Sequence, residues 1–103
     1  MGILSSLFGK KKSVDFAELI SQGAQIIDVR TPSEYSNGHL KSSKNIPLDR
    51  LAASVSKINK NKPVITCCAS GMRSSSARGI LLKAGFTEVY NGGPWTSLRS
   101  YAK

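Results

Sequence analysis

Two adjacent cysteines, Cys67 and Cys68, stand where an apolar run gives way to a polar loop. The run Pro63–Cys67 is typical of a strand, and the loop Ala69–Arg73 contains one glycine and one arginine. A helix-like pattern then begins at Ser74. A strand, a short loop and a helix in this order point backbone N–H groups at one sulfur atom. These groups, with a guanidinium nearby, stabilise a thiolate and bind anions.

The two cysteines have different expected places. Successive side chains of a strand point to opposite faces, so one thiol faces the loop and the other turns into the core. Cys68 directly precedes the loop and is the predicted nucleophile, with a pKa below the usual value of about 8.5. Cys67 is expected in the core, with a role as a resolving thiol as the alternative. A disulfide between neighbours is strained, which predicts reduced thiols and a reducing compartment, the cytoplasm.

The loop after Cys68 has the residue types that an anion site needs. Gly71 permits backbone angles that are closed to other residues, and Arg73 can hold a tetrahedral anion with its forked donors. The alternatives are that Cys68 is a small buried hydrophobe and that Arg73 pairs with a surface carboxylate. The candidate substrate-binding residues are Ala69, Ser70, Gly71, Met72, Arg73 and Ser74.

Helices and strands are expected to alternate along the chain, because apolar spacing, capping residues and helix-ending glycines recur in that order. The expected helices are Val14–Gln22 behind an N-cap at Ser13, a short helix opened by the capping-box spacing of Thr31–Glu34 and ending near Gly38, a helix after Pro47 with Leu48, Leu51, Val55 and Ile58 on one face, Ser74–Ala84, and Pro94–Tyr101. The expected strands are Gln25–Val29, Lys44–Ile46, Pro63–Cys67 and Thr87–Tyr90, and Asn91–Gly93 is expected to be a turn.

This alternation predicts an α/β fold. Its central parallel sheet of about four to five short strands would carry helices on both faces. Ligands of such sheets bind outside the carboxyl ends of the strands, which is where Cys68 stands.

The composition of the 103-residue chain fits one domain, residues 13–103, behind an N-terminal extension, residues 1–12. The formal net charge of +9 is scattered, and no lysine cluster is interleaved with stacking aromatics. This pattern argues against nucleic-acid binding and favours an ordinary solvated surface, with anionic substrates as an alternative. With one histidine and no second cysteine pair, no metal site is expected.

No apolar run approaches the roughly 20 residues that span a bilayer, although residues 1–12 could lie on a membrane surface as an alternative to packing on the domain.

The loop Cys68–Ser74 resembles the active-site loop of rhodanese-like sulfurtransferases. The resemblance extends in the right order over residues 13 to about 98. Ile26–Arg30, Glu34, Gly38–Leu40 and Asn45–Pro47 resemble the first signature of the family, and Leu82, Gly85–Phe86, Val89 and Gly92–Gly93 resemble its C-terminal part.

The resemblance implies a compact α/β domain and a cofactor-free sulfurtransferase, which we expect to be a monomer. Its loop cysteine, here Cys68, takes a sulfane sulfur from thiosulfate or a persulfide and passes it to cyanide or a thiol, with a thioredoxin-like or other sulfur-relay protein as a further candidate acceptor. The six residues from Cys68 to Arg73 match the sulfur-transfer loop, whereas phosphatase and arsenate-reductase relatives have one residue more. A non-catalytic protein-binding module and a phosphatase-like or arsenate-reductase-like enzyme remain the alternatives.

Four residues outside the loop are expected to support it. Asp28 and Arg30 are interpreted as a structural ion pair or loop anchor rather than a catalytic pair, and Glu34 as a capping residue. The family-like setting of His39 favours a structural hydrogen bond over a role as general base. The sequence departs from the family pattern at Cys67 and at Trp95, which follows Gly93 more closely than the usual tryptophan.

Overall fold

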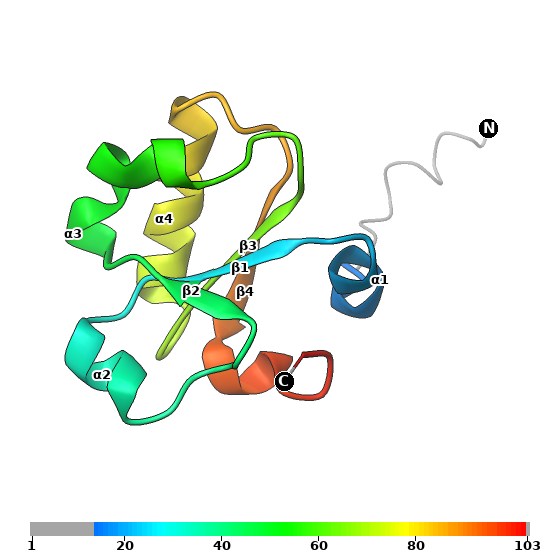
Figure 1. Ribbon diagram of the computed structural model, residues 1–103, viewed down its shortest axis with the longest axis vertical. Helices are drawn as coiled ribbons and strands as arrows, with labels where there is room; N and C mark the ends of the chain where they lie inside the picture. The colour runs from blue at the N-terminus through cyan, green and yellow to red at the C-terminus, as the bar shows by residue number, and fades with distance from the viewer. Residues whose placement is uncertain (1–13, 103) are drawn as a thin grey trace.

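The computed structural model describes residues 14–102, in which a parallel sheet lies between two layers of helices (Figure 1). Within this range the sheet has four strands, β1 (Gln25–Asp28), β2 (Ser43–Asn45), β3 (Val64–Cys68) and β4 (Val89–Pro94). They pair in the order β2-β1-β3-β4, and each pairing is parallel. The expected α/β fold with a central parallel sheet is thereby confirmed. The expected extension, residues 1–12, and the expected N-cap Ser13 lie outside the described residues.

The helices are divided between the two faces of the sheet. The α-helices α3 (Leu48–Leu51) and α4 (Met72–Lys83) lie on one side, with the 3-10 helix η2 (Ala52–Lys57) between them in sequence (Figure 1). On the other side lie α1 (Phe16–Ser21) and the 3-10 helix η3 (Trp95–Leu98). The short helix α2 (Pro32–Ser36) follows β1 and precedes β2. Since β-strand side chains alternate, each face of the sheet supplies a separate apolar cluster.

The two clusters divide the residues of each strand between them. The cluster under α3 and α4 includes Ile27, Leu51, Val64, Cys68, Ala77 and Leu81. The cluster under α1 and η3 includes Ile26, Leu40, Ile65, Cys67, Leu98 and Ala102. The alternation along β3 therefore sends the two cysteines to opposite faces, and both side chains are fully buried.

Several helix ends differ from expectation. α1 begins at Phe16, because the Asp15 side chain accepts a hydrogen bond from the N–H of Glu18 and caps the helix there. The helix after Pro47 is α-helical only over Leu48–Leu51 and continues as η2, whose serines and β-branched valine favour the α-helix less than alanine does. The closing helix is likewise short, since only Trp95–Leu98 is helical, as a 3-10 helix.

The expected turn at Asn91–Gly93 is wrong, because these residues belong to β4. A Cβ at Gly92 would lie 2.8 Å from Ile65 Cγ2 and 2.9 Å from the carbonyl oxygen of Thr66. The glycine is needed because β4 packs against β3 more closely than a side chain allows. A register irregularity between Thr66 and Cys68 accompanies this close approach. Between these positions β4 has one residue more than β3, and its last residue, Pro94, pairs with Cys68 at the end of β3.

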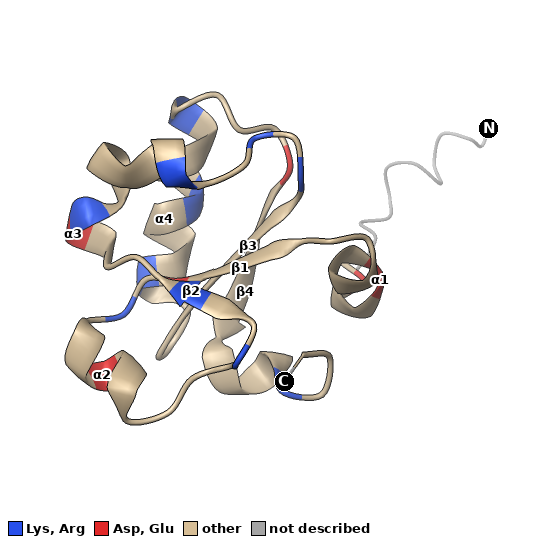
Figure 2. Cartoon of the chain, in the orientation of Figure 1, with Lys and Arg blue, Asp and Glu red and all other residues tan. Residues whose placement is uncertain are grey.

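No helix among residues 14–102 is long and apolar enough to cross a membrane. Figure 2 shows Lys and Arg on several helices and connecting segments of this view rather than on one element.

Candidate active site

The strand β3, the loop after it and α4 form the expected strand-loop-helix unit. The helix α4 starts two residues earlier than predicted. Gly71 is the N-cap of α4 and has a φ of 104°, in the left-handed region that favours glycine. A Cβ at this position would lie 3.5 Å from the Cα of Gly93, so β4 lies directly beside the loop. With Met72 as the first helical residue, Cys68 lies at the N-terminal end of a helix of 12 residues.

The sulfur of Cys68 lies among backbone N–H groups. The N–H of Gly71 donates to Sγ at 3.0 Å, and the N–H of Ser74 donates to it at 3.3 Å. Burial of the thiol raises the pKa of Cys68, but hydrogen bonds from Ser74, Gly71 and Ser70 outweigh it and hold that pKa below its ordinary value. The arrangement favours a thiolate. Although the sulfur is buried, it faces the N–H donors of the loop and is not surrounded by apolar side chains alone.

The hydroxyl of Ser74 links the loop to β4. Its Oγ lies 3.0 Å from the carbonyl oxygen of Gly71 and 2.6 Å from Asn91 Oδ1. Asn91 Oδ1 also accepts the N–H of Gly93 at 2.9 Å. Sequence reasoning missed Asn91 as a site residue because it assigned this stretch to a turn. An asparagine side chain pairing with the start of a helix far away in sequence leaves no periodic signal.

Arg73 is engaged by a carboxylate in this structure. Its Nη1 and Nη2 donate to Glu34 Oε1 and Oε2 at 2.8 and 3.0 Å, a bidentate pair. The hydrogen bond from Arg73 is the main cause that lowers the pKa of Glu34 to about 2, with the N–H of Thr31 next. The surface pairing that the sequence left open for Arg73 is thus the one present.

Glu34 also fulfils its expected capping role. In α2 (Pro32–Ser36) the N–H of Thr31 donates to Glu34 Oε1 at 2.9 Å, and the N–H of Glu34 donates to the hydroxyl of Thr31 at 3.2 Å. This capping box fixes the carboxylate on the first turn of α2. One side chain therefore both closes α2 and holds the arginine of the active-site loop.

Asp28 and Arg30 form a buried ion pair at the carboxyl end of β1. Arg30 Nε and Nη2 donate to the Asp28 carboxylate at 2.8 to 3.1 Å. The remaining donors of Arg30 reach the carbonyl oxygens of Glu34 and Gly38 at 3.3 and 2.8 Å. The guanidinium also lies 4.8 Å from the centre of the Trp95 ring, whose other contact of this kind is Arg99 at 4.7 Å. This pair ties together α2, the segment after it and η3.

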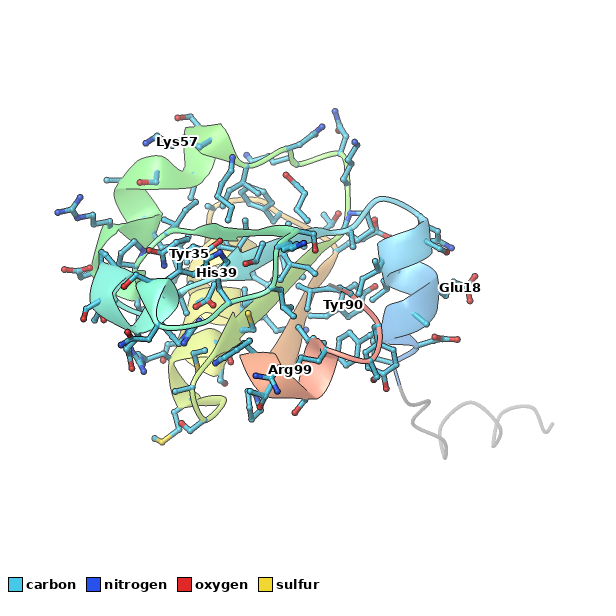
Figure 3. The ribbon with its side chains drawn as sticks, turned by 60° about the horizontal axis from the view of Figure 1, so that its bottom comes forward. Glu18, Tyr35, His39, Lys57, Tyr90 and Arg99 are labelled. Atoms are coloured by element: carbon cyan, nitrogen blue, oxygen red, sulfur yellow. The ribbon has the colours of Figure 1, made fainter. Side chains whose placement is uncertain are left out.

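His39 contacts Tyr35 through both its ring face and its edge. Its Nδ1 lies 2.7 Å from the carbonyl oxygen of Tyr35, so that nitrogen carries the proton, and the two rings stack with centroids 3.8 Å apart. Figure 3 shows the two labels together beside α2. The geometry is that of a local structural hydrogen bond.

Cys67 sits in a different environment from its neighbour. It is paired with Asp28 in the register of β1 and β3 and is fully buried. Burial is the main cause that raises the pKa of Cys67, and the negative charge of Asp28 adds to it. Both cysteines are free thiols.

The remaining loop residues lie at the surface. Ala69 and Ser70 are exposed, and the Met72 side chain is 77% exposed. Arg73 borders a cavity of about 290 Å³ with Val29, Thr31, Pro47, Leu48 and Asp49. A larger cavity of about 560 Å³ is lined by Gly38, His39, Leu40, Lys41, Trp95, Arg99 and Ala102. Among residues 14–102 no group of three His, Cys, Asp or Glu side chains is placed to hold a metal ion.

Comparisons with known proteins agree with this fold. The sequence model of the rhodanese-like domain matches residues 13–93, and the chain belongs to this family. The protein YqhL of Bacillus subtilis, whose name describes it as uncharacterized, is 44% identical over 68 residues, which are 66% of this chain and 54% of YqhL. The thiosulfate sulfurtransferase GlpE of Stutzerimonas stutzeri is 35% identical over 69 residues, covering 67% of this chain and 63% of that protein. The match thus spans about half of YqhL and less than two thirds of this GlpE.

Solved structures give the same family. A rhodanese from E. coli determined with anions superposes with a TM-score of 0.68 at 32% identity, covering 73% of this chain and 91% of that chain. A rhodanese-related protein from Thermoplasma volcanium superposes with a TM-score of 0.70 at 27% identity, covering 90% of this chain and 96% of that chain.

Proposed function

We propose that this rhodanese-like domain is a sulfurtransferase that carries sulfur as a persulfide on Cys68. The observation that carries the proposal is the pair of N–H groups, from Gly71 and Ser74, aimed at a sulfur whose pKa lies below its ordinary value. The GlpE relatives, which are named thiosulfate sulfurtransferases, support the same reaction class.

The reaction has two balanced steps. The Cys68 thiolate attacks the outer sulfur of thiosulfate, an S–S bond to Cys68 forms, and sulfite leaves with the electron pair of the broken bond. Cyanide or an acceptor thiolate then attacks the outer sulfur and leaves as thiocyanate or a new persulfide, and Cys68 returns to the thiolate. The loop N–H groups stabilise the negative charge in each state.

The charges of the chain suit an anionic donor. The net charge of +9 attracts anions, and α4 presents its N-terminus to the sulfur. Because Cys68 has no exposed surface, the residues that enclose its sulfur must move before a donor reaches it. Two buried free thiols fit a reducing compartment, and we propose the cytoplasm as the site of action.

Mass spectrometry tests the proposal directly. The intact protein incubated with thiosulfate should gain one sulfur atom, and added cyanide should remove it as thiocyanate. Cys68→Ser should gain none. Protein that stays unmodified with thiosulfate, polysulfide and cysteine persulfide would contradict the proposal and favour a binding module. Turnover of an arylphosphate or arsenate without sulfur transfer would favour the phosphatase-like or arsenate-reductase-like alternative.

A further inference from the structure

The hydroxyl of Ser74 has one proton and three acceptors within reach. The distances from its Oγ are 2.6 Å to Asn91 Oδ1, 3.0 Å to the carbonyl oxygen of Gly71 and 3.5 Å to Cys68 Sγ. A hydroxyl donates only one hydrogen bond at a time, whereas its oxygen can accept others. The amide oxygen of Asn91 is by far the nearest acceptor. When Asn91 holds the proton, the Ser74 oxygen turns its lone pairs to Cys68 and accepts from the thiol S–H.

The orientation of the Asn91 amide is fixed by its other neighbours. The N–H of Gly93 donates to Oδ1 at 2.9 Å, which requires an oxygen at this position, and Nδ2 donates to the carbonyl oxygen of Gly71 at 3.4 Å. A rotated amide would place an NH₂ group against the N–H of Gly93. The oxygen of Asn91 therefore faces Ser74.

We propose that Asn91 is a positioning residue that accepts the hydrogen bond of the Ser74 hydroxyl and so restrains how strongly the site favours the Cys68 thiolate. This inference deepens the proposed function and rests on it. Sulfur transfer makes opposed demands on Cys68, which must attack in the first step and leave in the second. A more basic thiolate attacks faster and a less basic one leaves faster. A Ser74 hydroxyl that can turn its hydrogen bond from Asn91 to Cys68 and back serves both steps.

Other charged groups near Cys68 act independently of this proton. Arg73 on α4 interacts electrostatically with Cys68 and is itself paired with Glu34 on α2. Cys67, the neighbour on β3, is held as a neutral thiol by burial and by Asp28 on β1, which is paired with Arg30. None of these residues hydrogen-bonds to Asn91. A change at Asn91 therefore reaches Cys68 through Ser74 or through Gly71, and removing the Ser74 hydroxyl separates the two routes.

A double-mutant cycle tests the proposal. The rate of iodoacetamide alkylation at Cys68 is followed against pH by mass spectrometry in Asn91→Ala, Ser74→Ala and the double variant, all in a Cys67→Ala background. Asn91→Ala releases the Ser74 proton to the sulfur, and we expect roughly three- to tenfold more thiolate below the titration midpoint. In the Ser74→Ala background the same change should alter the thiolate fraction by less than about twofold.

The direction of the shift in the titration midpoint is the informative quantity. A loosened loop weakens the N–H donors to Cys68 and raises the midpoint, whereas a Ser74 hydroxyl that turns to the sulfur lowers it. A midpoint that rises or stays in Asn91→Ala, or an equal shift with and without Ser74, would overturn the proposal. Asn45→Ala is the matched control, since this asparagine donates to the carbonyl oxygens of Asp28 and Arg30 and does not contact Ser74. It should leave the midpoint unchanged.

A second variant covers a failure of Asn91→Ala to fold. Asn91→Asp keeps an acceptor oxygen beside Ser74 and adds a negative charge, so we expect the Cys68 midpoint to rise, and a fall would contradict the proposal. Alkylation needs no sulfur donor. A failed midpoint prediction is therefore distinguishable from a failure to form the persulfide, which would contradict the proposed function instead.

Discussion

Cys67 and Cys68 are neighbours in the same strand, and neither side chain has exposed surface, yet their pKa values are shifted in opposite directions. Cys67 lies beneath η3 in an apolar cluster, opposite Asp28, and burial raises its pKa. Cys68 lies beneath the loop, where hydrogen bonds from Ser74, Gly71 and Ser70 outweigh burial and lower its pKa. The comparison teaches that burial alone does not decide the reactivity of a thiol. What decides it is whether donors converge on the sulfur.

The largest difference between the two cysteines is expected when each sulfur is removed in turn. Cys68→Ser should reduce thiocyanate formation from thiosulfate and cyanide by at least about 10³-fold, because the nucleophile is lost. Cys67→Ala, the matched control, should keep most of the activity and lose roughly 1 kcal/mol of stability, since it leaves a small cavity in the core. A Cys67→Ala protein as inactive as Cys68→Ser, although folded by circular dichroism, would assign Cys67 a chemical role.

The surroundings of Cys67 can be disrupted through the buried ion pair. Arg30→Met leaves the Asp28 carboxylate buried without its partner, and we expect a loss of about 3–5 kcal/mol in urea unfolding. Arg99→Met removes a guanidinium from the same Trp95 ring, but Arg99 is exposed and the cost should be about 1 kcal/mol or less. Similar losses in the two variants would show that the buried pair contributes little.

The pH dependence of alkylation separates the two thiols without any mutation. Cys68 should react with a midpoint below the ordinary cysteine value, because its folded pKa is lowered and the thiolate persists to lower pH. Cys67 should stay unmodified across the same range, since its pKa is raised and its side chain is enclosed. Peptide mapping after alkylation distinguishes the two sulfurs. Equal labelling of both at neutral pH would remove the difference on which the comparison stands.

The smallest effect is expected at the pair that holds the loop from outside. The pKa of Glu34 is lowered to about 2 from an ordinary value of 4.5, so its contribution to stability is complete above pH 4.5 and is lost as the pH falls towards 2. Both side chains are about one third exposed, and solvent screening limits the contribution to roughly 1 kcal/mol or less. Glu34→Gln should abolish this part of the acid sensitivity in urea unfolding at pH 2 to 6. Unchanged acid sensitivity would mean that the pair does not stabilise the fold.

The unit of β3, loop and α4 was predictable because its signals are local. An apolar run, a glycine and a helix start lie within a few residues of Cys68, and strand alternation separates it from Cys67. The capping box of Thr31 and Glu34 was predictable for the same reason, since both residues belong to one helix turn. Local order of this kind also sufficed for the parallel sheet.

Contacts between distant segments were not predictable from the pattern. Glu34 and Arg73 are 39 positions apart, and Ser74 and Asn91 are 17 apart, so only the folded arrangement brings each pair together. The glycines after Asn91 resembled a turn, although in the structure Gly92 allows two strands to approach closely. Residue types gave the candidates for the site, whereas packing decided their partners.

The alternation of β3 has one more consequence, for the size of the anion-binding loop that runs from the reactive cysteine to Arg73. Six residues run from Cys68 to Arg73, whereas seven run from Cys67 to the same arginine. A shift of this strand by a single position would place Cys67 instead of Cys68 at the loop, and it would lengthen the loop by one residue. The register of β3 against β1 and β4 therefore sets both which cysteine is the nucleophile and how long the anion-binding loop is.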